Sequence, residues 1–236
     1  MNGSGSYRGN MVKRPAAAAI GRTVHVSRKL RVPLFPLGGA ILFPRSQLPL
    51  HIFEPRYREM VKDAIEGAGR IAMIQPLRDD DDNKAPLYDV GCVGDIVGIE
   101  ELDDGRFNIV LLGTERFRLM GETKDDSAYR CADIDVSAFD DSDPPPLSLG
   151  ARAEVEREAR RLGDALGLAI DWAGVNRLDD EMLVNAIAQV APFDMGAKQA
   201  LLEEATLAGR ADLLVQLMQF HRVAITGGVE IEPTLQ

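Results

Sequence analysis

Cysteine and histidine are scarce in this chain, with two Cys and three His among 236 residues. Cys92 and Cys131 stand in apolar, strand-like surroundings and form no CxxC pair, which predicts reduced thiols in the core rather than a disulfide framework or a structural zinc site. His25, His51 and His221 are far apart in the sequence and show no ligand spacing. We therefore expect no metal site and no cofactor.

Positive charge and long apolar runs are also lacking. The 27 Lys and Arg residues stand against 37 Asp and Glu, and the formal net charge of −10 argues against nucleic acid and acidic membranes as partners, because both attract clustered basic side chains. The longest apolar run near the N-terminus is Ala16–Ile20, far shorter than a secretory signal or a membrane span. The expected location is therefore the cytoplasm.

Composition divides the chain into five predicted segments. Residues 1–28 mix Gly, Ser, Ala and basic residues without an apolar period, which is typical of a disordered basic leader. Residues 29–137 hold short apolar segments, residues 138–148 form a linker rich in Asp and Pro, residues 149–226 favour helices, and residues 227–236 form a tail. The sequence leaves open whether translation starts at Met1 or Met11.

In the first half, prolines interrupt one apolar segment after another. Proline cannot donate a ladder hydrogen bond, so Val32–Leu37 and Leu48–Phe53 are predicted to be edge or irregular strands. Pro55 suits the first position of a helix that runs to Gly67, and Asp104-Gly105 is a hairpin turn signal between two longer strands. This pattern favours a crossed, barrel-like sheet with one packed helix.

In the second half, apolar residues recur at helical spacing in four segments. These are Ala151–Leu168, Asp179–Val190, Asp194–Leu207 and Arg210–Ile225, and Asp194 is placed to cap the third of them. Helices with apolar stripes and short connections pack on one another, so this half is predicted to be a helical bundle. The expected fold class is α+β: a pseudo-β-barrel with one packed helix, followed by a C-terminal helical bundle.

Two neighbouring motifs carry a family resemblance. They read LFPLGGAILFP at residues 34–44 and LPLHIFEPRY at residues 48–57, and similar stretches follow in the same order at 88–94, 104–113 and 193–217. Over about residues 30–225 the chain resembles the N-terminal substrate-binding domain of the ATP-dependent protease Lon. The resemblance implies a PUA-like pseudo-barrel followed by helices, and a role in binding unfolded or degron-bearing polypeptides.

The catalytic signatures of a full Lon protease do not occur in the sequence. The phosphate-binding loop of its ATPase contains a Gly-Lys pair, and the chain has none. No lysine belongs to a recognisable Ser-Lys peptidase motif. We therefore expect a non-enzymatic, stand-alone relative of the Lon N-terminal domain, to which a protease label would come from the family name alone.

The resemblance motifs supply the candidate polypeptide-binding residues. An apolar segment exposed beside prolines would suit extended chains, although half of it must be core. The polar candidates have a structural interpretation as well, because His51 can serve as a hydrogen-bonded brace, and Arg56 with Tyr57 can stabilise a turn. The nine candidates are Leu34, Phe35, Ile41, Leu42, Phe43, His51, Phe53, Arg56 and Tyr57.

Three further features are assigned structural roles. Glu54 stands where a carboxylate meets the positive end of a helix dipole. Asp79–Asp82 lacks the spacing of a calcium loop and is predicted to be a solvated loop. Trp172 is predicted to anchor packing rather than to bind a ligand.

The leading functional hypothesis is reversible capture of unfolded or extended polypeptide, by apolar loops of the barrel and by a groove against the bundle. Such a module would act as an adaptor to a protease or as its competitor. Two alternatives stay open: a small-ligand pocket in a PUA-like barrel, and a scaffold for a dedicated protein partner. The sequence makes no prediction of oligomeric state.

Overall fold

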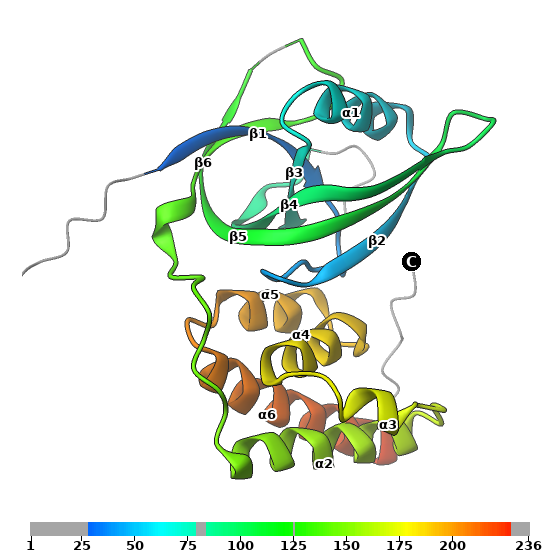
Figure 1. Ribbon diagram of the computed structural model, residues 1–236, viewed down its shortest axis with the longest axis vertical. Coiled ribbons are helices and arrows are strands. Elements are labelled where there is room, and N and C mark those ends of the chain that lie inside the picture. The colour runs from blue at the N-terminus through cyan, green and yellow to red at the C-terminus, as the bar shows by residue number, and fades with distance from the viewer. Residues whose placement is uncertain (1–27, 79–83, 125, 228–236) are drawn as a thin grey trace, which may run out of the picture.

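The structure is a computed structural model that describes residues 28–78, 84–124 and 126–227. The predicted leader before residue 28, the predicted loop Asp79–Asp82 and the tail from residue 228 onward lie outside the described residues. Figure 1 shows two stacked halves, with a curved sheet and one helix above and a group of helices below. The predicted α+β fold class is therefore confirmed.

In its described residues, the sheet half contains six strands, one α-helix and a short 3-10 turn. Pro55 is the first residue of its helix, where the missing N–H costs no hydrogen bond. Gly105 has a φ of 76° in the hairpin turn that the Asp-Gly signal predicted. In chain order, the elements are β1 Lys29–Pro36, β2 Gln47–Ile52, α1 Pro55–Glu66, β3 Arg70–Pro76, β4 Leu87–Glu101, β5 Phe107–Thr123, β6 Cys131–Asp135 and η1 Val136–Ala138.

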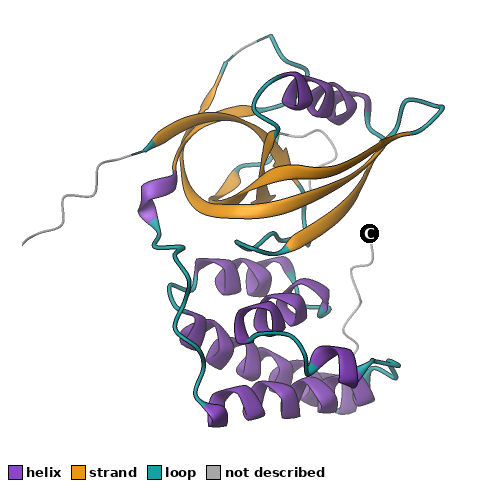
Figure 2. Cartoon of the chain, in the orientation of Figure 1, coloured by secondary structure: helices purple, strands orange, loops and turns teal. Residues whose placement is uncertain are grey.

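The strands form one sheet whose ends come together. Their order is β2-β5-β4-β3-β1-β6, and β5 pairs with β6 as well, so five strands close a ring and β2 extends the sheet outside it. Strands β4 and β5, with 15 and 17 residues, are long enough to bend around the ring, and two bulges interrupt their pairing. Figure 2 shows this curvature. Pro49 lies in β2 at the outer edge of the sheet, as the proline pattern predicted.

Gly113 of β5 allows the chain between β1 and β2 to pass close to the sheet. A Cβ atom at this position would overlap the carbonyl oxygen of Phe43. The Gly113 N–H donates to the carbonyl of Ser46, and its own carbonyl accepts from the N–H of Arg45. The chain before β2 is therefore fixed to β5 by its backbone.

The helical half contains five helices, four of which were predicted. Short polar side chains at Ser148, Asp179, Asp194 and Thr206 cap α2, α4, α5 and α6 by accepting a backbone N–H of the first turn. The helix α3 was missed, because its four residues are too few to show an apolar period. The bounds are α2 Leu149–Ala165, α3 Trp172–Val175, α4 Asp180–Val190, α5 Met195–Glu203 and α6 Leu207–Thr226.

Buried apolar side chains form three clusters. One lies between the ring of strands and α1, and a second lies among the five ring strands β1, β3, β4, β5 and β6. The third is the bundle core, which also takes in Ile41, Phe43 and Val90 from the sheet half. The two halves therefore share a core instead of touching only at a surface.

Cys92 and Cys131 are buried and free of disulfides, as predicted for core thiols. Burial raises the pKa of the Cys92 thiol well above its ordinary value, so the thiol stays protonated at neutral pH. In the part of the chain that the structure describes, no helix has the length and apolar character needed to cross a membrane.

Candidate functional site

The β1–β2 loop, defined here as residues 37–46, lies between the sheet and the helices. Leu42 packs in the cluster beside α1, whereas Ile41 and Phe43 pack in the bundle core. Neighbouring side chains of the loop thus enter two different cores. The loop therefore lies between the two halves and joins them by packing into both.

Burial corrects the prediction for six of the nine candidate binding residues, three of them in this loop and three in β1 and α1. The loop was expected to expose about half of its apolar side chains, but it has a core on each side and buries both faces. Side chains without solvent contact offer no surface to a bound polypeptide. The six buried candidates, each at most 5% exposed, are Leu34, Phe35, Ile41, Leu42, Phe43 and Tyr57.

Polar side chains of the bundle bind the loop backbone. Lys198 Nζ donates to Gly39 O over 2.7 Å and to Gln189 O over 3.1 Å. Gln189 Nε2 in turn donates to Ile41 O over 3.1 Å. Desolvation lowers the pKa of Lys198, which lies against these carbonyl oxygens. The loop is therefore held by directional bonds as well as by packing.

Arg116 of β5 is a buried cation at the boundary between the halves. Its Nε donates to Asp141 Oδ1 over 2.8 Å, and its Nη1 donates to Leu202 O and Glu204 O over 2.9 and 2.7 Å. Asp141 belongs to the predicted Asp/Pro-rich linker, which is therefore anchored to β5 at this point. A buried ion pair is stable only when its partners are satisfied, as they are here.

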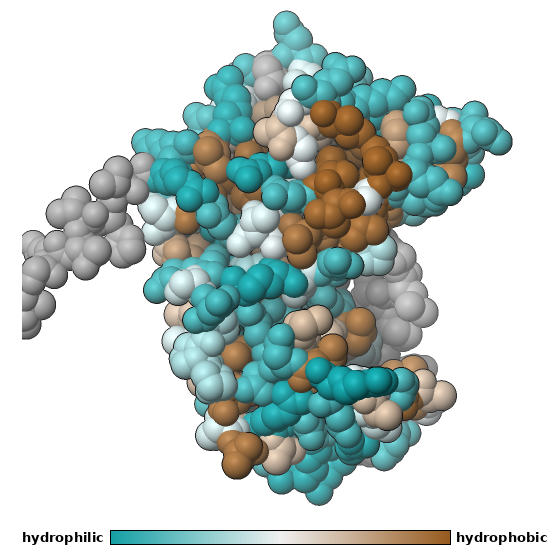
Figure 3. All heavy atoms as spheres, viewed as in Figure 1, coloured by the Kyte–Doolittle hydropathy of each residue, from teal (hydrophilic) through white to brown (hydrophobic). Residues whose placement is uncertain are grey.

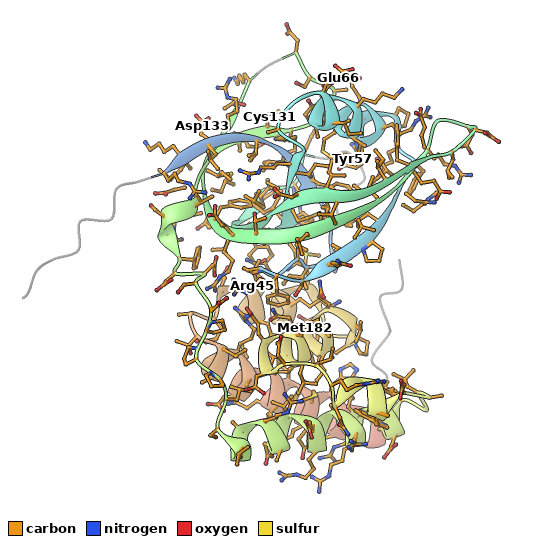
Figure 4. The ribbon with its side chains drawn as sticks, viewed as in Figure 1. Arg45, Tyr57, Glu66, Cys131, Asp133 and Met182 are labelled. Carbon is orange, nitrogen blue, oxygen red and sulfur yellow. The ribbon has the colours of Figure 1, made fainter. Side chains whose placement is uncertain are left out.

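Arg45 forms a second ionic contact across the boundary. Its Nε and Nη2 donate to the two carboxylate oxygens of Glu181 on α4, each over 2.7 Å. These hydrogen bonds raise the pKa of Arg45. Figure 4 shows Arg45 at the lower side of the sheet half, close to the helix that carries Met182. Side-chain contacts thus occupy the boundary where the sequence hypothesis placed a binding groove.

His51 has the structural role that was one of its two interpretations. Arg106 Nη1 can only donate, so His51 Nε2, 3.1 Å away, accepts. The proton therefore resides on Nδ1, which donates to Asn108 Oδ1 over 2.7 Å. Asn108 Nδ2 completes the chain by donating to Glu100 over 2.8 Å. This exposed network braces β2 against β5 and contains no nucleophile.

Arg56 and Tyr57 also brace the start of α1. Arg56 Nη2 forms an ion pair with Glu54 at 2.6 Å, and the guanidinium lies 4.9 Å from the centre of the Tyr57 ring. The centre of the Tyr57 ring lies 4.5 Å from the centre of the Phe35 ring. Desolvation raises the pKa of the Tyr57 hydroxyl. Glu54 stands at the helix start as predicted, although its side chain makes no capping hydrogen bond.

No metal centre is formed by the residues that the structure describes. Among them, no group of three or more His, Cys, Asp or Glu side chains is placed to hold a metal ion. His221 packs edge-on against Phe193 with the ring centres 6.0 Å apart, and His25 lies outside the described residues.

An apolar surface lies open on the sheet half beside α1, where Figure 3 shows apolar residues gathered. Ile96 N donates to Gly69 O over 2.8 Å, which holds β4 close to the end of α1. We call this surface the sheet patch. It consists of residues on α1, β2 and β4 that are half-buried or exposed: Leu48, Leu50, Ile65, Ile96 and Ile99.

Cross-strand pairing builds the sheet patch in two rows. Leu48 and Ile96 flank Leu111 in one row, because both pair with that residue of β5. Leu50 and Ile99 flank Ile109 in the next row. The central residues are buried and the flanking ones are not. The sequence shows the alternation within β2, but only the registers of β2 and β4 on β5 reveal a continuous surface.

Phe53 is the apolar candidate that stays exposed. It follows β2, its side chain is 60% exposed, and its ring stacks on His51 with the centres 6.3 Å apart. Side chains two residues apart on a strand share a face, so His51 and Phe53 lie on the face of β2 opposite Leu48 and Leu50. Phe53 therefore does not belong to the sheet patch.

Comparison with known proteins agrees with this architecture. The family model of the ATP-dependent protease La (LON) substrate-binding domain matches residues 31–219. The Lon protease of Anaeromyxobacter dehalogenans is 26% identical over 197 residues, which are 81% of this chain and 23% of that protein. Lon protease 2 of Sorangium cellulosum is 31% identical over 198 residues, 79% of this chain and 24% of that protein. The chain thus spans about a quarter of these relatives.

Two solved structures share the fold at low sequence identity. A Lon N-terminal domain protein from Xanthomonas campestris superposes with a TM-score of 0.59 at 20% identity, covering 79% of this chain and 98% of the other. The N-terminal domain of Mycobacterium avium complex Lon protease also gives 0.59, at 17% identity, covering 81% of this chain and all of that domain. These two likenesses concern the arrangement of the elements.

Proposed function

This chain belongs to the family of Lon substrate-binding domains, and we propose on that premise that it captures unfolded or extended polypeptide reversibly on the sheet patch. No covalent step is involved, and selectivity comes from apolar contact and shape. The observation that carries this proposal is the exposure of Ile65 and Ile99, at 47% and 48%, beside three half-buried aliphatic side chains.

The chemistry of the sheet patch matches what an unfolded chain offers. Unfolded polypeptides expose aliphatic side chains that a folded protein hides, and transfer of such groups from water is favourable in proportion to the area buried. An open surface without a deep pocket accepts many sequences. The patch therefore favours a broad class of apolar segments over one defined ligand.

Strand addition is the less suitable mode of capture here. An added strand would pair with the free edge of β2, but Pro49 lies in the middle of that strand and has no N–H to donate. We therefore propose that side-chain contacts on the face of the sheet supply the affinity. The captured chain would then be presented to a protease, or be withheld from one.

The small-ligand alternative has less support in the sheet half. The ring of strands is filled by buried side chains such as Leu34, Ile74, Phe117 and Ile134. A dedicated protein partner would use the same exposed sheet patch. The experiment below separates that alternative from capture of unfolded chains, because a dedicated partner binds in its folded form.

Fluorescence anisotropy with a labelled unfolded polypeptide, and with the same polypeptide folded, tests the proposal. We expect binding of the unfolded form only, and we expect it to persist at high salt because apolar contacts are not screened. Ile99→Glu should weaken binding about tenfold or more, since it places a charge at the centre of the contact.

Met120→Glu is the matched control, because Met120 is an equally exposed apolar residue at the other end of the same sheet. It should leave binding unchanged. Equal binding of the folded and unfolded forms, or equal loss in the two variants, would contradict capture at the sheet patch.

A further inference from the structure

The helical bundle contains an apolar cavity that polypeptide capture on the sheet patch does not use. Its volume is about 250 Å³, and it lies among α2, α3, α4 and α6. Every side chain that lines it is apolar. The lining includes Leu162, Leu166, Trp172, Ile187, Val190 and Met218. We call it the bundle cavity.

The bundle cavity is accessible from solvent. Two of its lining residues, Leu168 and Val190, are 56% and 81% exposed and therefore stand at its rim. An apolar cavity holds water poorly, because a water molecule needs two or more polar partners. A cavity of about 150 Å³ with such a lining takes up benzene, so this larger one admits a longer apolar group.

A cation stands beside this apolar site. The guanidinium of Arg160 lies 4.4 Å from the centre of the Trp172 ring, and Trp172 lines the bundle cavity. Arg160 Nη2 donates to Asn176 Oδ1 over 3.3 Å. Within the described ranges, no carboxylate lies at ion-pair distance from Arg160. Its charge is therefore available to a ligand.

The charged side chains near Arg160, in contrast, already have partners. Arg161 is bound by the buried carboxylate of Glu158 at 2.7 Å, and Arg157 lies 3.5 Å from the same group. The carboxylate of Asp171, next to Trp172, accepts the N–H groups of Ala173 and Gly174 over 3.1 Å each. The carboxylate nearest in sequence to Trp172 is thus already engaged in capping α3.

We propose that the bundle cavity binds a ligand made of an apolar chain of roughly eight carbons that ends in a carboxylate. The chain occupies the cavity, and the carboxylate pairs with Arg160 at the edge of Trp172. Two sources share this chemistry: a free aliphatic carboxylic acid, and a polypeptide whose last residue is apolar. The proposal does not rest on the proposed function, because the bundle cavity and the sheet patch share no residue.

Intrinsic fluorescence provides a direct readout, because Trp172 is the sole tryptophan of the chain. Titration with octanoate should change its emission in a saturable manner. Octanol should bind about two- to fivefold more weakly, which is what one solvent-exposed ion pair contributes, and octylammonium should bind most weakly of the three. No change with any probe, or tightest binding of octylammonium, would overturn the proposal.

A variant that fills the bundle cavity tests the location. Ala186 lines it, so Ala186→Leu should weaken octanoate binding at least tenfold, while filling the cavity keeps or raises the unfolding temperature. The control is Ala200→Leu, because Ala200 is exposed on α5 and does not line the cavity. Octanoate binding by Ala186→Leu at wild-type strength would show that the site lies elsewhere.

A second variant tests the charge. Arg160→Met keeps an unbranched side chain over Trp172 but removes the cation, so octanoate should lose its advantage over octanol. Arg31→Met is the control, since Arg31 is an exposed arginine on β1 that pairs with Asp133. If octanoate keeps its full advantage in Arg160→Met, the proposed role of Arg160 is wrong.

Two peptide arms distinguish the sources of the ligand. A short peptide that ends in Leu-Leu is titrated with a free carboxylate and with an amidated end. Tighter binding of the free-acid peptide than of octanoate identifies a chain end as the source, and the reverse order identifies a free acid. Ile99→Glu should leave octanoate binding intact, so failure of the sheet patch and failure of the bundle cavity give different results.

Discussion

The β1–β2 loop and the strand β2 that follows it have similar sequences and opposite surroundings. Both are apolar and contain proline. Phe43 in the loop is fully buried, with the Arg210 guanidinium 4.8 Å from its ring, whereas Phe53 at the end of β2 is 60% exposed. The loop has a core on each side, and β2 has packing on one face and a free edge.

This difference separates stability from binding within one continuous motif. The loop contributes to two cores and so joins the sheet to the helices. Strand β2 contributes Leu48 and Leu50 to a surface that is still open. Substitutions in the loop should therefore act on the free energy of unfolding, and substitutions at the sheet patch should act on binding.

The largest contrast is expected between the two phenylalanines. Phe43→Ala should lower the free energy of unfolding by about 3–5 kcal/mol, because it leaves a cavity where the two halves meet. Phe53→Ala should lower it by about 0.5 kcal/mol or less, since the side chain is mostly in water. Urea denaturation of both variants measures the difference. Equal losses would mean that the loop and the strand do not differ in this way.

A smaller effect is expected where the loop is tied to α4 by Arg45. Arg45→Ala should lose about 1 kcal/mol with the Glu181 ion pair, and it keeps a residue with a side chain at a φ of 62°. Arg45→Gly loses the same pair but relieves about 1 kcal/mol of left-handed strain. Glycine should thus be better tolerated than alanine in thermal unfolding. The reverse order would show that the strain is negligible.

The smallest effect is a pH dependence on the helical side of the boundary. Asp180 accepts a hydrogen bond from Arg152 over 2.7 Å and from the backbone N–H of Leu147 over 2.8 Å. The Arg152 hydrogen bond is the main reason that the pKa of Asp180 is lowered. The stabilisation is present above the unfolded-state pKa of about 4 and is lost as the pH falls through the lower folded-state value.

Asp180→Asn should therefore lose less stability than the wild type between about pH 5 and pH 3. Urea denaturation at the two pH values measures this. Asp212→Asn, at an exposed site on α6, should keep the wild-type dependence. A wild-type dependence in Asp180→Asn would assign the acid sensitivity to other carboxylates.

Local patterns predicted most of the elements but not their environment. The Asp-Gly turn, Pro55 at the start of α1 and Asp194 at the start of α5 act on their own backbone, so each was recognisable from its neighbours. The burial of Phe43 depends on α6, whose Arg210 is far along the chain. The sheet patch depends on which residues of β2 and β4 pair with β5.

The bundle cavity was outside the reach of sequence reasoning for the same reason. Trp172 was predicted to anchor packing, and it does contact Arg160, but its place beside a cavity requires the packing of four helices. The linker is a similar case. Its Asp and Pro content predicts a linker, but the pairing of Asp141 with Arg116, which is buried in β5, depends on the fold.

Patterns in the sequence predicted the α+β class, the edge position of β2, the hairpin between two long strands, four of the helices and the cap at Asp194. These features depend on spacings of a few residues and on the limits that proline and glycine place on the backbone. Contacts made in the folded protein determine which apolar side chains pack in a core and which remain exposed. That outcome depends on contacts between residues far apart in the chain, which local spacing does not record.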